Sequence, residues 1–267
     1  MFWTNISIPP VELWLSKTCS KPSKAPKIQK TPFQEARKGS PAFDQSMASS
    51  VVVNSDTRGM GDYSPLLRAA RNDHEAVVRL LLDTGKVNPS IEDCDLNRTL
   101  EDVDPNHKDI SHLTPLFYAA KMGHEAVVKL LLEAEDSNPD IQNWLLRTPL
   151  SLAAEYGPEA VVKLLLEIEN VEVKIRGNSG YTPLLHAAEK GHESVLKLLV
   201  DTDKVDRETK DSSDCTPLLR AAKNSHEGIV RLLLARGANK HAVNNSGEAS
   251  LLLATREGHE AVMKLLS

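Results

Sequence analysis

Apolar residues recur along most of the chain in a block that appears twice with identical spelling. The stretch EAVVKLLLE occupies residues 125–133 and again residues 159–167, 34 residues later. In the first copy the apolar residues stand at i, i+1, i+4 and i+5, namely Val127, Val128, Leu131 and Leu132. This spacing places them in one stripe of a helix, with charged residues on the other side. The block therefore predicts an amphipathic helix that needs a neighbour to cover its stripe.

A second pattern precedes these blocks and predicts another helix. It is clearest in TPLLHAAEKGHESVLKLLV, which begins at Thr182. A threonine can cap a helix whose first residue is proline, because the N–H that proline lacks has no partner inside the helix. We expect this cap at Thr114, Thr148, Thr182 and Thr216. The Ala pair that follows lets the helix lie close to its neighbours, and a turn former ends it before His-Glu opens the second helix.

The two-helix unit is repeated six times at a nearly constant spacing. Copies begin at Ser64, Thr114, Thr148, Thr182, Thr216 and Ala249, so that successive starts lie 50, 34, 34, 34 and 33 residues apart. Neither helix can bury its apolar stripe alone, whereas stacked copies can bury one another's. The sequence therefore predicts an all-α array in which each unit supplies core to the next.

The TPL start, the Ala pair, the GH-like turn, the VVxLLL helix and the period together resemble ankyrin repeats. The sequence HEAVVKLLL is most similar to the ankyrin arrays of filamentous fungi, which are often attached to NACHT-type proteins. The resemblance covers residues 59–267 and implies a solenoid of helix-turn-helix pairs with β-hairpin fingers, which binds a partner protein through its concave face. We expect about six repeats starting near residues 59, 109, 143, 177, 211 and 244, the last of them truncated.

Two segments fall outside this pattern. Residues 1–58 are basic and rich in Pro and Ser, which predicts a largely disordered tail; a decayed repeat from residue 31, or a role in localisation or in binding anionic surfaces, stays open. An acidic insertion of about 16 residues separates repeats one and two, and we interpret it as a solvated loop. Six of its residues have the spacing of calcium-loop ligands, namely Asp93, Asp95, Asn97, Thr99, Glu101 and Asp104, but Arg98 stands where the sharp turn needs glycine.

Some residues depart from the family pattern. The finger turn favours a left-handed residue, which Gly180 and Gly247 supply, whereas Leu146 stands at the same place and should not tolerate that geometry. We therefore expect the finger around Leu146 to be irregular. Arg68 and Arg220 stand where the family usually has an apolar residue, and we expect their stems to be buried while the charged groups stay in water.

Composition and charge restrict the classes of partner and the cellular compartment that we expect. Residues 1–62 hold 8 of the 32 Lys and Arg and 5 of the 37 Asp and Glu, which leaves 24 against 32 in the rest, a balance of minus 8. An acidic body disfavours nucleic acid as the partner. No stretch is long and apolar enough for a membrane span, and three unrelated cysteines indicate a reducing compartment. We expect an intracellular protein, cytoplasmic in preference to nuclear, with no obligate oligomer.

The chain carries none of the common catalytic motifs. Five histidines occupy the same turn of their repeats, where we expect them to bond to backbone: His74, His124, His192, His226 and His259. Successive copies would stand about 10 Å apart, which is too far to share a metal. No nucleophile elbow, zinc helix or phosphate loop is present, so we expect no enzyme, no cofactor and no metal.

Alignment on the Thr-Pro start predicts which residues bind the partner. On the finger rim these are Leu113, Trp144, Leu145, Arg147, Ser179, Tyr181 and Cys215, and on the inner helices Met122, Glu155, Tyr156, Glu189, Lys190, Lys223 and Asn224. Trp144, Tyr156 and Tyr181 are the expected anchors, since exposed aromatics dominate binding hot spots. The alternative that Trp144 and Leu145 pack against a neighbouring finger stays open. So does a second hypothesis, that the chain is an accessory fragment of a larger NACHT-type or enzymatic protein.

Overall fold

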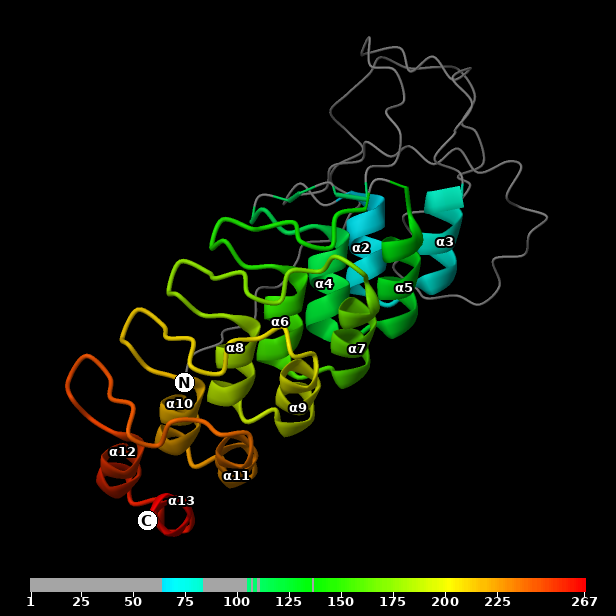
Figure 1. Ribbon diagram of the computed structural model, residues 1–267. Coiled ribbons are helices and arrows are strands. Elements are labelled where there is room, and N and C mark those ends of the chain that lie inside the picture. The colour runs from blue at the N-terminus through cyan, green and yellow to red at the C-terminus, as the bar shows by residue number, and fades with distance from the viewer. Residues whose placement is uncertain (1–63, 84–104, 107, 110, 136) are drawn as a thin grey trace, which may run out of the picture. The chain divides into compact units, whose positions relative to one another are not determined.

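The computed structural model describes residues 64–83, 105–106, 108–109, 111–135 and 137–267. The predicted tail, the decayed repeat, the first finger and the calcium spacing of the insertion lie outside the described residues. Within those ranges the chain forms twelve helices, arranged in two rows (Figure 1). The inner helices are α2 (Pro65–Arg71), α4 (Pro115–Met122), α6 (Pro149–Tyr156), α8 (Pro183–Lys190), α10 (Pro217–Lys223) and α12 (Ser250–Glu257). The outer helices are α3 (Glu75–Asp83), α5 (Glu125–Glu133), α7 (Glu159–Glu167), α9 (Glu193–Asp201), α11 (Glu227–Ala235) and α13 (Glu260–Leu266).

Each inner helix packs against the outer helix that follows it and against the inner helices of the neighbouring units, and the outer helices pack on one another in the same order. This confirms the predicted all-α array of helix pairs. The core runs between the rows, where both Ala residues of α4 and the stripe residues Val127, Val128 and Leu131 are almost fully buried. Full burial of one such Leu or Val side chain stabilises the fold by about 1.5–3 kcal/mol relative to exposure.

Caps define where the inner helices begin. The side-chain oxygens of Thr148, Thr182 and Thr216 each accept a hydrogen bond from the backbone N–H three residues later, as predicted. Ser64 does the same at the start of α2. Thr114 is the exception, because its buried hydroxyl makes no such bond, so the predicted cap is wrong there.

Four of the five predicted histidines, His124, His192, His226 and His259, bond to backbone, but to that of the preceding unit and not to their own loop. His192 Nε2 lies 2.9 Å from the carbonyl oxygen of Glu155, and His226 Nε2 lies 2.8 Å from that of Glu189. Because a carbonyl only accepts, each Nε2 carries the proton. The ring of His192 also lies against Gly157, whose φ of +91° and close contact both require glycine. These histidines therefore fasten successive units together.

Five fingers share one hydrogen-bond pattern. In each, the first residue donates to the carbonyl of the fifth, and the fourth donates back to the first. Among the described residues the fingers form no strands, only one bridge between Val243 and Ala249, so they are tight turns and not extended hairpins. The finger around Leu146 is as regular as the others, with Leu146 at φ +57°, so the expected irregularity is wrong. The expectation fails because the hydrogen bonds of the turn impose the left-handed geometry on whatever residue stands there.

Candidate protein-binding surface

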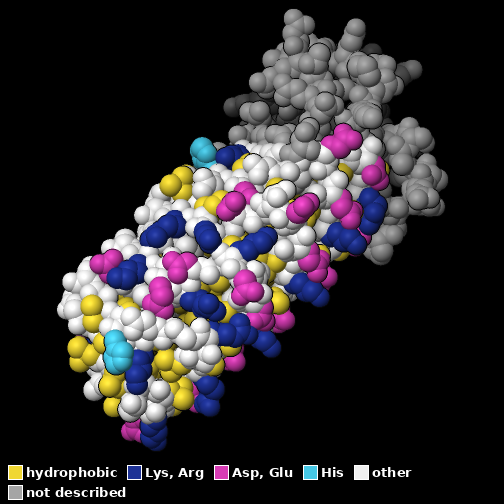
Figure 2. Space-filling view, in the orientation of Figure 1, with side chains coloured by type: hydrophobic (Ala, Val, Ile, Leu, Met, Phe, Trp, Pro, Cys, Tyr) yellow, Lys and Arg dark blue, Asp and Glu magenta, His cyan; other side chains and the backbone are white. Residues whose placement is uncertain are grey.

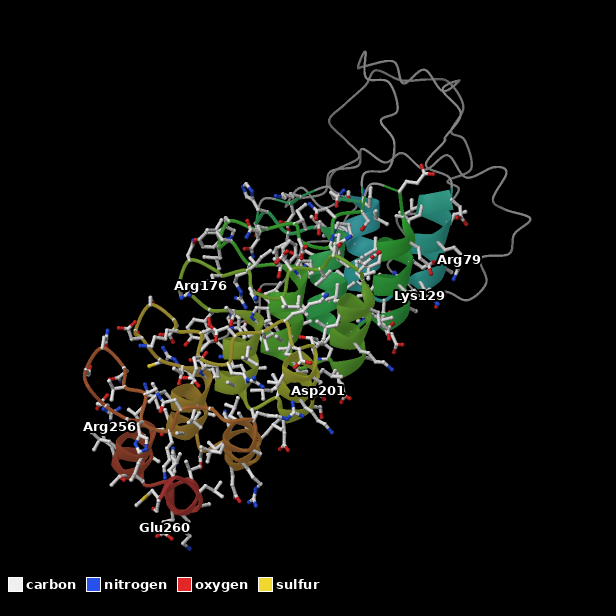
Figure 3. All side chains as sticks on the ribbon, in the orientation of Figure 1. Arg79, Lys129, Arg176, Asp201, Arg256 and Glu260 are labelled. Atoms are coloured by element: carbon white, nitrogen blue, oxygen red, sulfur yellow. The ribbon has the colours of Figure 1, made fainter. Side chains whose placement is uncertain are left out.

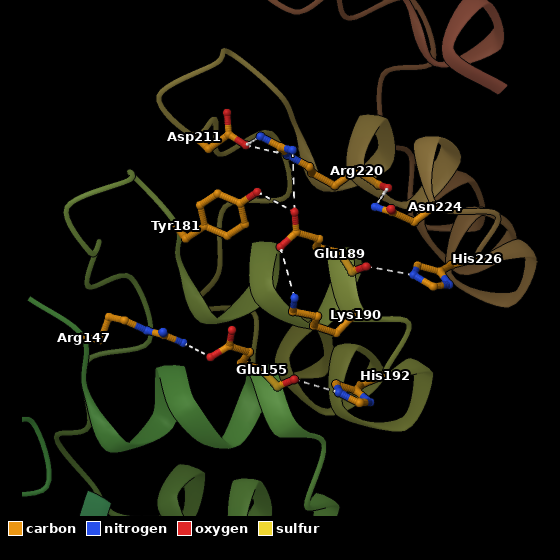
Figure 4. Close-up of polar contacts among 10 residues, drawn as sticks. All are labelled: Arg147, Glu155, Tyr181, Glu189, Lys190, His192, Asp211, Arg220, Asn224 and His226. Carbon is orange, nitrogen blue, oxygen red and sulfur yellow. Dashed lines mark hydrogen bonds and ion pairs between the residues drawn. The ribbon is translucent and has the colours of Figure 1, made fainter. Parts of the chain in front are cut away.

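The fingers and the exposed side of the inner helices form one surface, which we call the inner surface. It comprises the five finger turns, which begin at Asp109, Asn143, Gly177, Asp211 and Asn244, and the helix residues that face them. Figure 4 shows the central part of this surface, where side chains from three successive units are joined by polar contacts.

The fingers are held by a side chain at their first position. Asn143 Oδ1 accepts hydrogen bonds from the backbone N–H groups of Leu145 and Arg147, at 2.9 and 3.0 Å. The first residues of the other Asp- or Asn-led fingers do the same. Neighbouring fingers are also joined, since the N–H of Asn178 donates to the carbonyl of Leu145 at 2.9 Å. An Asp or Asn five residues before Thr-Pro is the sequence signal for these hydrogen bonds, and it was not among the predicted features.

Three of the five fingers contact their own inner helix through residues eight positions apart, and the fingers of Asp109 and Asp211 do so through residues nine apart. Arg147 forms an ion pair with Glu155, and the Tyr181 hydroxyl donates to Glu189 at 2.8 Å (Figure 4). The last unit has the opposite polarity, with a carboxylate on the finger and an arginine on the helix. Burial acts to raise the pKa of Glu155, but the bond and charge of Arg147 outweigh it and hold that pKa below its ordinary value. In these units a residue of the finger is therefore paired, by charge or by a hydrogen bond, with a residue of the inner helix.

Arg220 corrects the expectation that its charged group stays in water. Its guanidinium lies 2.6 Å from the carboxylate of Asp211, whose side chain is fully buried, and 3.6 Å from Glu189. Only 15% of the Arg220 side chain is exposed. Although burial acts to lower the pKa of Arg220, the bond to Asp211 raises it. The position accepts arginine because the finger supplies the carboxylate, a partner nine residues upstream.

His186 and Tyr181 lie between these ion pairs. The rings are 4.9 Å apart, and burial raises the pKa of Tyr181, with the Glu189 bond adding to the effect. His186 is 7% exposed and neither ring nitrogen has a hydrogen-bond partner. Burial, reinforced by the charge of Arg147 and opposed by Glu155, lowers the pKa of His186 to about 4. Its imidazole is therefore neutral at physiological pH.

A cavity of about 220 Å³ opens beside His186. Its lining consists of Leu145, Arg147, Gly177, Asn178, Ser179, Tyr181, His186 and Glu189. Five of these eight residues belong to the set predicted from the sequence. The structure thus brings residues from two fingers and one helix around a single hollow.

The predicted site residues differ in how far they reach the surface. Trp144, Met122 and Tyr156 are exposed by 61, 56 and 49%, and the ammonium of Lys121 stands 4.7 Å from the centre of the Tyr156 ring. Ser179, Lys190, Lys223 and Asn224 are exposed polar residues; Leu113, Leu145, Arg147, Glu155, Tyr181 and Glu189 are partly buried. Cys215 is 6% exposed and packs with Leu219 and Leu253, so it offers little to a partner. Burial also raises the pKa of its thiol.

Charge is divided between the two rows of helices. The inner helices hold seven basic and three acidic residues, whereas the outer helices hold six basic and ten acidic residues. Figure 3 shows Arg79, Lys129 and Asp201 projecting from the outer row. In Figure 2 the two signs are interspersed over the visible face, and hydrophobic side chains gather near the last unit. The inner row is therefore basic within an acidic array.

Two further observations concern the described part of the chain. No group of three or more His, Cys, Asp or Glu side chains there is placed to hold a metal ion. None of its helices has the length and apolar content needed to cross a membrane.

The sequence matches a known protein family. The model for ankyrin repeats, in three copies, matches residues 36–143, 91–176, 135–211, 168–244 and 204–267. These overlapping matches run from residue 36 to residue 267, which is well over half of the chain. A comparison with curated proteins found no match.

Proposed function

Because the chain belongs to the ankyrin-repeat family, we propose that it is a non-catalytic interaction module that binds a partner protein through its inner surface. The observation that carries the proposal is the exposure of Met122, Trp144 and Tyr156 on one face of the array. Large apolar side chains of this kind are usually buried in a folded protein. Gathered on a surface, they are typical of protein-binding sites.

The fingers are held by hydrogen bonds and ion pairs, which we call the frame, and this frame supports the proposal. Backbone hydrogen bonds join neighbouring fingers, and ion pairs join the fingers to the inner helices. A surface held in this way loses little conformational entropy on binding, so more of the contact energy appears as affinity. The cavity beside His186 adds a recess into which a partner side chain can fit.

Members of the ankyrin-repeat family are typically non-catalytic and bind proteins. We extend that property to this chain, with no cofactor, and place it inside the cell, in the cytoplasm in preference to the nucleus. The absence of the common catalytic motifs from the sequence supports the non-catalytic assignment. We also propose six repeats with the boundaries given above; the finger turns at residues 109, 143, 177, 211 and 244 support the last five, and the first lies outside the described residues.

The finer resemblance is a separate proposal. The sequence HEAVVKLLL resembles fungal arrays attached to NACHT-type proteins. On that resemblance alone, the chain would act as the sensing part of a larger protein. Sequencing the transcript that encodes the chain tests this directly. A phosphate-loop motif in the same reading frame supports it, and a stop codon on each side contradicts it.

The binding proposal is tested by capture from cell lysate on the full chain. We expect a specific protein to be retained by the parent and lost by the double variant Trp144→Ala, Tyr156→Ala. Tyr181 is unsuitable for this test because its hydroxyl is bonded to Glu189, so its loss would disturb the frame. The matched control is Leu252→Ala, an exposed apolar residue at the end of the stack. Equal capture by the parent and the double variant, with helicity unchanged, contradicts the proposal.

A further inference from the structure

We propose that the cavity beside His186 binds a carboxylate group of the partner protein. This inference rests on the proposed function, since it names the chemical group that the partner places on the inner surface. The cavity lies at the finger that begins with Gly177, and this finger differs from the other four, each of which begins with Asp or Asn.

The fingers that begin with Asp show how the inner surface holds a carboxylate. Asp211 Oδ1 accepts hydrogen bonds from the backbone N–H groups of the third and fifth finger residues, at 2.7 and 3.1 Å. Its Oδ2 accepts from Arg220 Nε at 2.7 Å, nine residues further along the chain (Figure 4). Asp109 is held in the same way, with the hydroxyl of Tyr118 as the donor at 2.7 Å. One carboxylate oxygen thus binds the finger, and the other binds the inner helix.

The residue nine positions after the start of a finger varies with the residue that starts it. Where the finger begins with Asp, the later residue is a hydrogen-bond donor, Tyr118 or Arg220. Where the finger begins with Asn, the later residue is Leu152 or Leu253, which has no polar side chain. A carboxylate has two acceptor oxygens, whereas the Asn amide has one. A donor at the later position is therefore paired with a carboxylate in the finger.

The finger that begins with Gly177 has these donors but no carboxylate. The residue nine positions later is His186, whose neutral imidazole has one N–H to donate. His186 is 7% exposed, and within the described residues neither ring nitrogen has a hydrogen-bond partner. The backbone N–H groups of Ser179 and Tyr181, the third and fifth finger residues, likewise have no acceptor in the described part of the chain. Glycine has no side chain that could accept from these three groups.

The cavity is lined by the residues that carry these donors and by Arg147. A Cβ placed on Gly177 would lie 3.2 Å from Cγ of Arg147, so a carboxylate that starts there stands beside this arginine. The Nε of Arg147 is also buried without a partner among the described residues, and it adds a fourth donor. The volume of about 220 Å³ is below the range of about 300–1,000 Å³ that is typical of small-molecule sites. A single side chain or a chain end fits this space.

Hydrogen-bond donors, and not excess charge, select the ligand. The cavity lining includes Glu189, but its carboxylate lies 3.6 Å from Arg220, and Arg147 is paired with Glu155. These two pairs leave no net charge. Asp109 shows that two backbone N–H groups and a neutral hydroxyl hold a carboxylate on this surface. Because a carboxylate only accepts hydrogen bonds, it matches a site made of donors.

The test titrates sodium acetate into the full chain at about pH 7, where acetate is ionised, and follows the backbone N–H groups by two-dimensional NMR. Acetamide is the neutral control of the same size, and sodium chloride controls for ionic strength. We expect acetate to shift the signals of Ser179 and Tyr181. The signals of Ser213 and Cys215 should not move, because their N–H groups already bond to Asp211. The Kd for acetate should be at least about fivefold lower than that for acetamide, since hydrogen bonds to charged groups are stronger.

Two variants test the site from the side of the protein. Gly177→Asp supplies a carboxylate from the chain itself, so it should abolish the acetate shifts. It should also have a Tm about 2–5 °C above that of Gly177→Ala, which adds the same Cβ without the carboxylate, so that crowding at this position cancels. His186→Leu gives this finger the leucine found where a finger begins with Asn, and the preference for acetate over acetamide should disappear.

Two further probes distinguish the sources of the carboxylate. The α-amide of N-acetylaspartic acid carries only a side-chain carboxylate, and N-acetylglycine carries only a chain-end carboxylate. Tighter binding of the first supports an Asp or Glu side chain of the partner as the occupant, and tighter binding of the second supports its C-terminus.

The outcomes separate this inference from the proposed function. Shifts at Ser179 and Tyr181 that acetamide or sodium chloride reproduces overturn the inference, as does acetate binding that survives Gly177→Asp. An absence of any response to acetate up to about 100 mM overturns it as well. Each of these results leaves the proposed function standing, because that function is tested by capture of a protein through Trp144 and Tyr156. Acetate binding as expected, in a chain that captures no protein, contradicts the proposed function alone.

Discussion

Replacing His186 with leucine tests the electrostatic description of the inner surface. The imidazole is buried without a hydrogen-bond partner at either nitrogen, which leaves its polar atoms unsatisfied. The equivalent positions of two other units hold Leu152 and Leu253, both buried, so the array already accommodates leucine there. We expect His186→Leu to fold and to raise the free energy of unfolding by about 1–3 kcal/mol at pH 7.5.

Lowering the pH adds a second, independent contribution to the difference in unfolding free energy between His186→Leu and the parent. The folded protein holds the pKa of His186 at about 4, whereas the ordinary value is 6.5. Between these values the unfolded chain binds more protons than the folded one, so stability rises with pH and is lost as pH falls from 6.5 towards 4. At pH 5 the penalty amounts to about 2 kcal/mol, which His186→Leu removes.

The assay is denaturant-induced unfolding of the full chain at several pH values from about 7.5 to 4.5, followed by circular dichroism. The quantity of interest is the difference in unfolding free energy between His186→Leu and the parent, since other titrating groups cancel in it. The control is His241→Leu, which removes an exposed imidazole. A difference for His186→Leu that does not widen as the pH is lowered, or that equals the control's, would refute the reasoning.

Three further predictions concern the frame. Leu146→Gly should be more stable than Leu146→Ala by about 1 kcal/mol in thermal unfolding, the reverse of the usual order, because the position is left-handed. Gly157→Ala should lower the free energy of unfolding by at least about 2 kcal/mol, since a Cβ would stand 2.6 Å from the His192 ring at φ +91°; a loss under about 0.5 kcal/mol would contradict this. Arg147→Glu and Glu155→Arg should each destabilise by about 1–3 kcal/mol, while the double swap, which copies the polarity of the last unit, should recover most of the loss.

The helices were predictable because their signals are local. Apolar spacing fixes which face is buried, and Thr-Pro with a turn former fixes where the first helix starts and ends. Repetition made the packing predictable too, because each unit meets another copy of itself. These signals need no knowledge of distant residues.

The features that were not predictable depend on contacts between elements. The left-handed Leu146 follows from a turn that five fingers share, so the common hydrogen bonds override the preference of one residue. Arg220 is mostly buried because Asp211 stands in its own finger and Glu189 on the inner helix of the preceding unit, a pairing that appears only once the chain is folded. Tyr181 was expected as an exposed anchor, but its hydroxyl bonds to Glu189, which makes it part of the frame.

The central claim is that a partner protein binds the inner surface, and site-specific photo-crosslinking tests it most directly. A benzophenone amino acid placed at Tyr156, on α6, reports contacts of the inner surface, and the same group at Lys129, on α5, reports contacts of the outer helices. In lysate we predict a discrete crosslinked protein from position 156 and none from position 129. A crosslink from position 129 alone, or from neither position, would contradict the claim.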